Sequence, residues 1–127
     1  MNSNLVIRRF LASFLFAGLI LPLQAQTQIV PGQDYVIVSF RTGRVLDVFE
    51  ISKENGAPII FWDRHDGGNQ VFRLEPAGDD YYRIRNTLSD KLIEIRNSEQ
   101  GDDAMAQQWE YTGAANQQFK LIPASGG

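Results

Sequence analysis

The sequence predicts an all-β domain built from two copies of one unit. Three observations support this prediction. Apolar residues recur with a period of two, turn residues return every ten or so positions, and one pattern occurs twice at a spacing of 47 residues without a gap. The residues that recur unchanged are Tyr35, Ile37, Ala57, Trp62, Asn69, Gln70, Phe72, Leu74, Pro76 and Ala77, which return as Tyr82, Ile84, Ala104, Trp109, Asn116, Gln117, Phe119, Leu121, Pro123 and Ala124.

Each copy contains four predicted strands that are separated by turn signals. The expected strands are residues 35–40, 45–49, 59–62 and 72–74 in copy one, and residues 82–86, 92–96, 105–109 and 119–122 in copy two. No stretch shows the period of 3.6 residues that is typical of an amphipathic helix. We expect Phe72, Leu74, Phe119 and Leu121 to lie in the core.

Alternation along the second and third strands places an acid and a tryptophan on one face of each copy. The apolar neighbours of Asp47 point to one side of its strand, so Asp47 points to the other side, where Trp62 also lies. The same alternation groups Glu94 with Trp109. We therefore expect each acid to lie beside an indole on an outward, solvent-facing surface of a hairpin.

The first 25 residues predict a secretory signal peptide. Arg8 and Arg9 precede a short apolar run over residues 10–23, and Ala25 supplies a small residue for cleavage. The run is short for a bilayer span, although an uncleaved anchor is the alternative interpretation. The chain has no cysteine, which excludes a lipid-anchored lipoprotein and disulfides. We expect a secreted or periplasmic protein.

Length and charge limit the remainder to one small acidic domain. Cleavage would leave 102 of the 127 residues, and loss of two arginines would take the net charge from −3 to −5. We expect a lead-in segment over residues 26–33 and a single domain over residues 34–127, with copies at 34–78 and 80–125. Negative charge argues against nucleic acid and anionic membranes as partners.

A family resemblance rests on an ordered set of residues that occurs twice. In copy one the set is Leu46-Asp47-Val48, Gly56-Ala57, Trp62 and the ending Asn69-Gln70-Val71-Phe72, and copy two ends in Asn116-Gln117-Gln118-Phe119. This set resembles the ricin-B-type lectin repeat, which ends in Gln-x-Trp or Gln-x-Phe. The resemblance covers residues 35–124. It implies a β-trefoil-like domain with two of the usual three repeats, and Gln70, Phe72, Gln117 and Phe119 as its structural Gln-x-Phe endings.

The resemblance also implies a lectin-like, carbohydrate-binding function and names the residues that would serve it. The family's acid is matched by Asp47 and, one methylene longer, by Glu94. Ile60 stands where the family often has glutamine, which copy two matches. The candidate carbohydrate-binding residues are Asp47, Trp62 and Asn69 in copy one and Glu94, Gln107, Trp109 and Asn116 in copy two. A carboxylate can accept hydrogen bonds from two neighbouring hydroxyls, and an indole covers the C–H face of a pyranose.

Each candidate also has a structural interpretation. The tryptophans could pack the hairpins, and the acids could be solvated strand residues. Asn69 and Asn116 could form loop turns. We expect Gln70 and Gln117 to hydrogen-bond backbone groups rather than a ligand, because buried amides require partners.

The sequence predicts no catalytic, metal or cofactor site. Its one histidine, His65, lies in a glycine-flanked segment without an evident nucleophile, and is expected to be a surface loop residue. Glu99, Asp102 and Asp103 lack the ordered spacing of a calcium loop. Structural zinc has no set of cysteines and histidines. We therefore expect a non-enzymatic protein.

Two other functions stay open at this point. One is a protein-interaction or inhibitor module that uses loop residues such as Arg64, His65 and Asp66. The other is an accessory subunit whose missing repeat comes from a partner. Two repeats alone would leave open sheet edges, so we expect a homo-oligomer or a partner that completes the trefoil.

Overall fold

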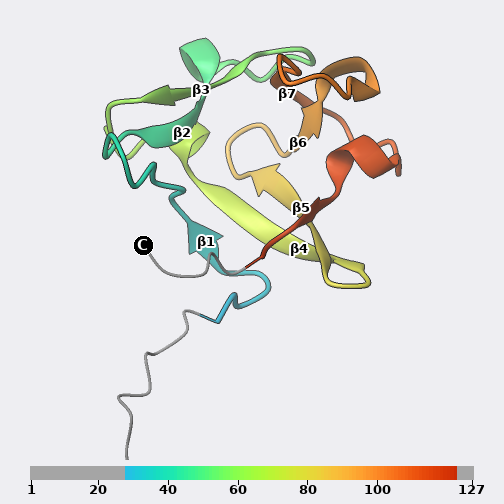
Figure 1. Cartoon of the computed structure of the whole chain (residues 1–127). Coiled ribbons are helices and arrows are strands. Elements are labelled where there is room, and N and C mark those ends of the chain that lie inside the picture. Colours follow the sequence, from blue (N-terminus) through green and yellow to red (C-terminus); the bar gives the residue numbers. More distant parts are fainter. Residues whose placement is uncertain (1–27, 123–127) are drawn as a thin grey trace, which may run out of the picture.

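The computed structural model describes residues 28–122, which form two similar β-rich units, one from each sequence repeat (Figure 1). We call these units repeat one and repeat two. The predicted signal peptide lies outside the described residues and stays a prediction. Within residues 28–122, no helix has the length and apolar character that crossing a membrane requires.

Four strands in each repeat are joined by loops and single 3₁₀ turns. Repeat one contains β1 (Asp34–Tyr35), β2 (Val45–Val48), β3 (Ile59–Trp62) and β4 (Phe72–Gly78), with turns η2 (Phe49–Ile51) and η3 (Gly68–Gln70). Repeat two contains β5 (Tyr81–Asn86), β6 (Leu92–Ile95), β7 (Ala106–Trp109) and β8 (Phe119–Lys120), with turns η4 (Arg96–Ser98) and η5 (Ala115–Gln117). The 3₁₀ turns are the only helical elements among the described residues, so the all-β prediction is confirmed.

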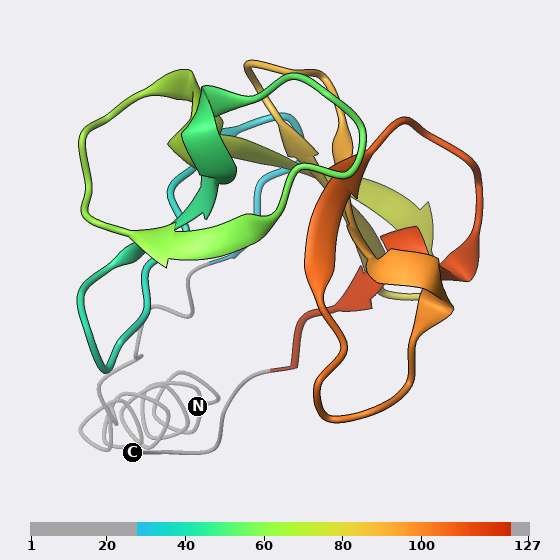
Figure 2. The same ribbon diagram turned by 90° about the horizontal axis from the view of Figure 1, so that it is seen from above.

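The β4–β5 hairpin connects the two repeats and forms the centre of the main sheet. Its register runs from Phe72 opposite Asn86 to Gly78 opposite Tyr81, with a bulge near Pro76. The main sheet has the order β1-β4-β5-β6-β7, with β8 also paired to β5, whereas β2 and β3 pair only with each other. Seen from above, the β2–β3 hairpin and the β6–β7 hairpin lie in separate units (Figure 2).

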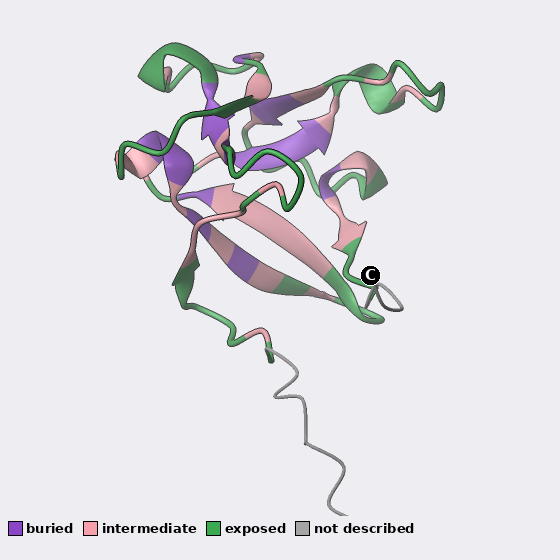
Figure 3. Cartoon of the chain, turned by 60° about the vertical axis from the view of Figure 1, so that its left-hand side comes forward, coloured by how far each residue is buried: buried purple, intermediate pink, exposed green. Residues whose placement is uncertain are grey.

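Apolar residues from both repeats form one core. Its buried members are Val48, Ala57, Phe72 and Ile93, and Ile37, Leu46, Ile59, Ile84, Ala106 and Phe119 pack against them. Complete burial of a side chain such as Phe72 contributes about 1.5–3 kcal/mol. In Figure 3 the buried segments lie mainly on the strands, and most of the loops are exposed. Burial of Phe72 and Leu74 and the packing of Phe119 confirm three of the four predicted core residues.

Two predictions about the ends of the fold are wrong. The strand predicted over residues 35–40 stops at Tyr35, beyond which only Val38 bridges to Val45. β1 pairs with β4 alone, so the chain beyond Tyr35 leaves the ladder. Leu121 is 42% exposed instead of buried. It follows β8, which pairs only with Tyr81 and Tyr82 of β5, and so lies outside the sheet.

A glutamine fastens repeat two to repeat one. The Gln108 side chain donates hydrogen bonds to the carbonyls of Ser52 and Glu54, at 2.9 and 2.8 Å. Its backbone exchanges bonds of 2.9 Å with Gly56 and Ala57. Gln108 is completely buried. The two repeats are therefore joined by satisfied polar contacts as well as by the apolar core.

Candidate functional site

The β2–β3 hairpin supplies the acid and the indole of repeat one. Asp47 is opposite Ile60, and Trp62 is opposite Val45, so Asp47, Ile60 and Trp62 share one face. The predicted placement of the acid beside the indole is confirmed, since both line the same pocket. The expected outward exposure is wrong for the acids. Asp47 is only 3% exposed because the chain after β3 folds over it, whereas Trp62 is 53% exposed.

Gln70 fixes the carboxylate of Asp47. The buried amide donates to Asp47 Oδ2 at 2.7 Å and to the carbonyl of Asp63 at 2.9 Å, and its oxygen accepts from the backbone N–H of His65 at 2.9 Å. Gln70 thus bonds backbone groups, as predicted, and also holds the acid. Asp47 Oδ1 accepts no hydrogen bond from any residue that the structure describes. The carboxylate is therefore oriented through one oxygen and can accept hydroxyl donors through the other.

His65 faces the same carboxylate from the loop after β3. Its Nδ1 accepts a hydrogen bond from the backbone N–H of Gly67 at 3.2 Å, which assigns the proton of the neutral imidazole to Nε2. Nε2 lies 3.5 Å from Asp47 Oδ2. The expectation of a surface loop residue is confirmed, since His65 is exposed and lies in the loop after β3. The imidazole also lines the pocket beside the acid and presents an N–H donor there.

Gly67 leaves room for this histidine. A Cβ on Gly67 would lie 2.6 Å from Cε1 and 2.8 Å from Nδ1 of His65, and 2.7 Å from Oδ1 of Asn69. The equivalent loop of repeat two has Ala114 in place of Gly67 and Thr112 in place of His65. The glycine is therefore required by the imidazole of His65 and not by the backbone of the turn, since repeat two forms the same turn with alanine.

The two candidate asparagines make the same backbone contact. Asn69 Nδ2 donates to the carbonyl of Val48 at 3.2 Å, and Asn116 Nδ2 donates to that of Ile95 at 2.9 Å. Both Oδ1 atoms are buried and accept no hydrogen bond from the described part of the chain. Asn69 also lines the pocket. Each asparagine therefore holds its turn against the preceding strand and keeps one acceptor unused.

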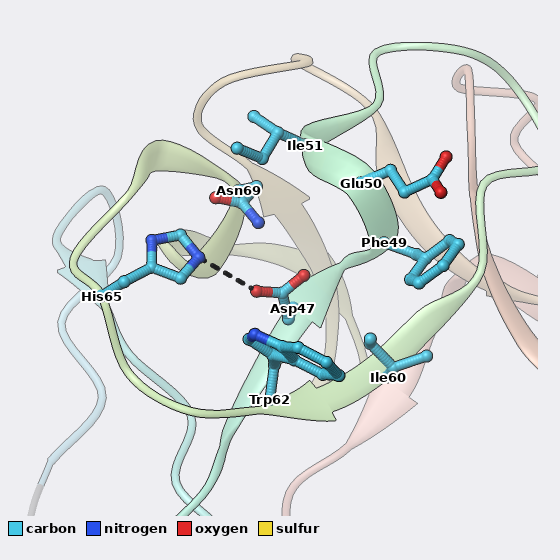
Figure 4. A pocket seen from close by; sticks show the side chains of 8 residues that line it. All are labelled: Asp47, Phe49, Glu50, Ile51, Ile60, Trp62, His65 and Asn69. Carbon is cyan, nitrogen blue, oxygen red and sulfur yellow. Dashed lines mark ion pairs between the residues drawn. The ribbon is translucent and has the colours of Figure 1, made fainter.

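These side chains surround a cavity of about 240 Å³ on repeat one. Its lining residues are Asp47, Phe49, Glu50, Ile51, Ile60, Trp62, His65 and Asn69. In Figure 4, His65 and Asn69 lie on one side of the Asp47 carboxylate, and Phe49 and Ile60 lie on the other, with Trp62 below. His65 and Asn69 thus face Phe49 and Ile60 across the carboxylate, while Ile51 lies beyond Asn69 and Glu50 lies on the side of Phe49. Four lining residues were not predicted from the sequence: His65, Phe49, Glu50 and Ile51.

The acid of repeat two is held differently. Gln107 donates to Glu94 Oε1 at 2.9 Å, and Gln117 donates to Oε2 at 3.0 Å. Glu94 is buried and Trp109 is partly buried, with its ring next to Gly56 of repeat one. The strand register thus places Gln107 opposite Glu94, where its amide donates to the carboxylate. Both carboxylate oxygens of Glu94 already accept an amide donor.

The structure keeps the two candidate sets apart. Asp47, Trp62 and Asn69 meet around one cavity of repeat one, whereas Glu94, Gln107 and Trp109 lie on the β6–β7 hairpin and Asn116 lies in η5. Among residues 28–122, no three histidine, aspartate or glutamate side chains converge to hold a metal ion. The chemistry of the repeat-one cavity is that of a hydrogen-bonding carboxylate and imidazole next to an open aromatic face.

Comparisons with known proteins give a family match. A model described as ricin-type β-trefoil lectin domain-like matches residues 24–109 and again residues 68–127. A comparison with curated proteins gives no match.

Solved structures show the same fold. The designed three-fold symmetric protein ThreeFoil is 33% identical with a TM-score of 0.71, over 75% of this chain and 68% of that one. The exo-β-1,3-galactanase 1,3Gal43A from Clostridium thermocellum is 37% identical with a TM-score of 0.71, over 75% of this chain and 21% of that one. The chain thus spans about a fifth of the galactanase. A Polyporus squamosus lectin, solved with a human-type influenza-binding epitope, shares the fold at 17% identity and a TM-score of 0.60, over 72% of this chain and 32% of that one.

Proposed function

We propose, from the premise that this chain belongs to the ricin-type β-trefoil lectin domain-like family, that it is a non-enzymatic carbohydrate-binding module. The fold agrees with this premise, since the described residues form two of the three repeats of a β-trefoil. Lectins are among its structural neighbours. Because a fold alone does not determine a function, the support for carbohydrate binding comes from the residues of the site.

One observation carries the proposal: the Asp47 carboxylate lies at the base of a cavity beside the half-exposed indole of Trp62. A pyranose presents neighbouring hydroxyls and a patch of C–H groups. The hydroxyls would donate to Asp47 in charge-assisted hydrogen bonds, which are stronger than neutral ones. The C–H patch would lie on the indole, which loses little rotamer freedom on binding. The Nε2–H of His65 would donate to a ring hydroxyl.

We propose that repeat one binds the sugar more tightly than repeat two. Gln70 engages only Oδ2 of Asp47, whereas two glutamines engage both oxygens of Glu94. A sugar at repeat two would have to displace or share these bonds. Binding by Glu94, Gln107, Trp109 and Asn116 stays a prediction, with the weaker affinity.

The open, small cavity supports weak binding. A millimolar dissociation constant corresponds to about −4 kcal/mol, so useful capture of a polysaccharide would require several sites acting together. We also propose that the protein is exported. The support for export is the predicted signal peptide over residues 1–25.

A matched pair of tryptophan variants tests the proposal. Wild type, Trp62→Ala and Trp109→Ala would be applied to a glycan array and then titrated calorimetrically with the best monosaccharide. We expect Trp62→Ala to lose binding and Trp109→Ala to keep most of it, with all three chains folded by circular dichroism. An array without signal for the wild type, or equal losses in the two variants, contradicts the proposal.

An exposed edge of repeat one favours an additional role in assembly. Phe61 is 49% exposed, although its equivalent in repeat two, Gln108, is completely buried under the 52–54 turn of repeat one. We propose that a second copy of this chain covers Phe61. Light scattering at micromolar concentration should show an assembly of the isolated chain that Phe61→Ser weakens. A well-folded monomer of this chain would refute association with a second copy.

A further inference from the structure

Three apolar residues that line the repeat-one cavity have polar counterparts in repeat two. Phe49 and Ile51 correspond to Arg96 and Ser98, and Ile60 corresponds to Gln107. Phe49 and Ile51 are both exposed, so they contribute little to the core. They are also two of the residues that line the cavity. The difference between the repeats therefore concerns the surface that a ligand would meet.

The backbone does not require these apolar residues. The N–H of Phe49 bonds to the carbonyl of Pro58 at 3.0 Å, and that of Arg96 bonds to Met105 at 2.8 Å. Both turns then close with the same bond three residues later, at 3.2 Å in repeat one and 3.1 Å in repeat two. Repeat two builds the same turn from Arg96, Asn97 and Ser98, all of them polar.

Ile51 is moreover a costly residue at its position. Glu50 and Ile51 both have a φ of 56°, and Asn97 and Ser98 have 53° and 54°. This left-handed region suits asparagine, but it is a rare and strained conformation for a β-branched side chain. Ile51 thus occupies a strained position, at the rim of the cavity, that serine fills in repeat two. A contact of Ile51 with a ligand would offset this cost.

We infer that the repeat-one site selects sugars that carry an apolar substituent, which packs against Phe49 and Ile51 while the ring hydroxyls bond to Asp47. The inference rests on the proposed function and names the class of sugar. In Figure 4, Phe49 lies across the Asp47 carboxylate from His65 and Asn69, and Ile51 lies beyond Asn69. A free hexose can place its C–H patch on Trp62, but it has only hydroxyls left to offer Phe49 and Ile51, which would stay hydrated. The substituent would be an aryl or alkyl aglycone, or a methyl group on the ring as in N-acetylated and 6-deoxy sugars.

The test is a calorimetric titration with matched probes. Galactose, glucose and mannose would each be compared with their methyl and phenyl glycosides, and with their N-acetylated and 6-deoxy counterparts. We expect at least one substituted probe to bind the wild type about tenfold more tightly than its parent hexose. The aglycone and ring-methyl arms distinguish the two sources of the apolar group, and a gain in either arm supports the inference.

Two double variants then test whether Phe49 and Ile51 cause the tighter binding of the substituted sugar. The double variant Phe49→Arg/Ile51→Ser places the repeat-two residues on repeat one, and Phe49→Ala/Ile51→Ala removes the apolar side chains without adding charge. In both variants the substituted sugar should bind no more tightly than its parent hexose. Equal affinity of the wild type for parent and substituted sugars would overturn the inference and leave the proposed function in place. Retention of the preference in a folded double-alanine variant would overturn it as well, whereas failure to bind any probe would refute both proposals.

Discussion

Replacing Gly67 with alanine should weaken sugar binding without weakening the fold. The new Cβ would lie within 2.6 Å of Cε1 and 2.8 Å of Nδ1 of His65, so the imidazole must move away. It would then lose its hydrogen bond to the N–H of residue 67 and its position opposite Asp47. A single neutral hydrogen bond contributes about 0.5–1.5 kcal/mol, so the dissociation constant should rise roughly two- to thirteenfold.

Stability should change in the opposite direction. Gly67 has φ −74° and ψ 154°, and Ala114 at the equivalent position has φ −76° and ψ 156°. Alanine therefore fits this backbone. Exchange of glycine for alanine at a compatible position stabilises a protein by about 0.4–1 kcal/mol, through the lower entropy of the unfolded chain. Calorimetric titration and urea unfolding of the same samples would measure both effects.

A double-mutant cycle identifies His65 as the cause. Gly67→Ala made in a His65→Ala background should produce a much smaller further loss of affinity, because the imidazole is already absent and only Asn69 Oδ1 is left close to the new Cβ. Ala114→Gly is the matched control, which should lower the stability slightly and leave the affinity unchanged. An unchanged dissociation constant in Gly67→Ala, or a loss of more than about 2 kcal/mol in stability, would refute this reasoning.

Two further predictions concern stability. Gln108→Ala should lower the free energy of unfolding by about 2 kcal/mol, because the carbonyls of Ser52 and Glu54 lose buried donors; a urea midpoint equal to that of the wild type would contradict it. Arg85 holds the pKa of Glu75 below its usual value, chiefly through a side-chain hydrogen bond. The ion pair therefore stabilises the fold above the ordinary carboxyl pKa, and this contribution is lost as the pH falls through the lowered value. The urea midpoints of wild type and Glu75→Gln should differ at pH 7 and converge as the pH falls through the lowered pKa of Glu75, whereas a constant difference would show that the charge of Glu75 is not the cause.

The repeat made much of the fold predictable. Strand alternation depends only on local sequence, so it placed Asp47 and Trp62 on one face, and β3 has the predicted bounds. Alternation gives a direction and not an exposure, which is why the burial of Asp47 was missed. Asp47 is buried by the loop that carries Gln70, a residue distant in sequence whose side chain donates a hydrogen bond to the carboxylate.

The composition of the site depended on tertiary contacts. The sequence does not show that the loop after β3 folds back, so His65 had no visible partner there. Gln107 was expected to face a ligand, but the strand register sets it opposite Glu94, where its amide donates to the acid. The exchange of Phe49 and Ile51 for Arg96 and Ser98 is visible in the sequence. Its relevance to ligand binding follows only from the structure, which places both apolar residues at the cavity.

The two indole N–H groups allow a direct test of sugar binding by repeat one, since the chain contains only two tryptophans. A proton–nitrogen correlation spectrum of the labelled protein would be recorded during titration with the best-binding sugar, with Trp109→Phe to assign the signals. We expect a saturable shift of the Trp62 signal while the Trp109 signal moves little. If the Trp109 signal moves first, or neither signal moves while the sugar binds, repeat one is not the binding site.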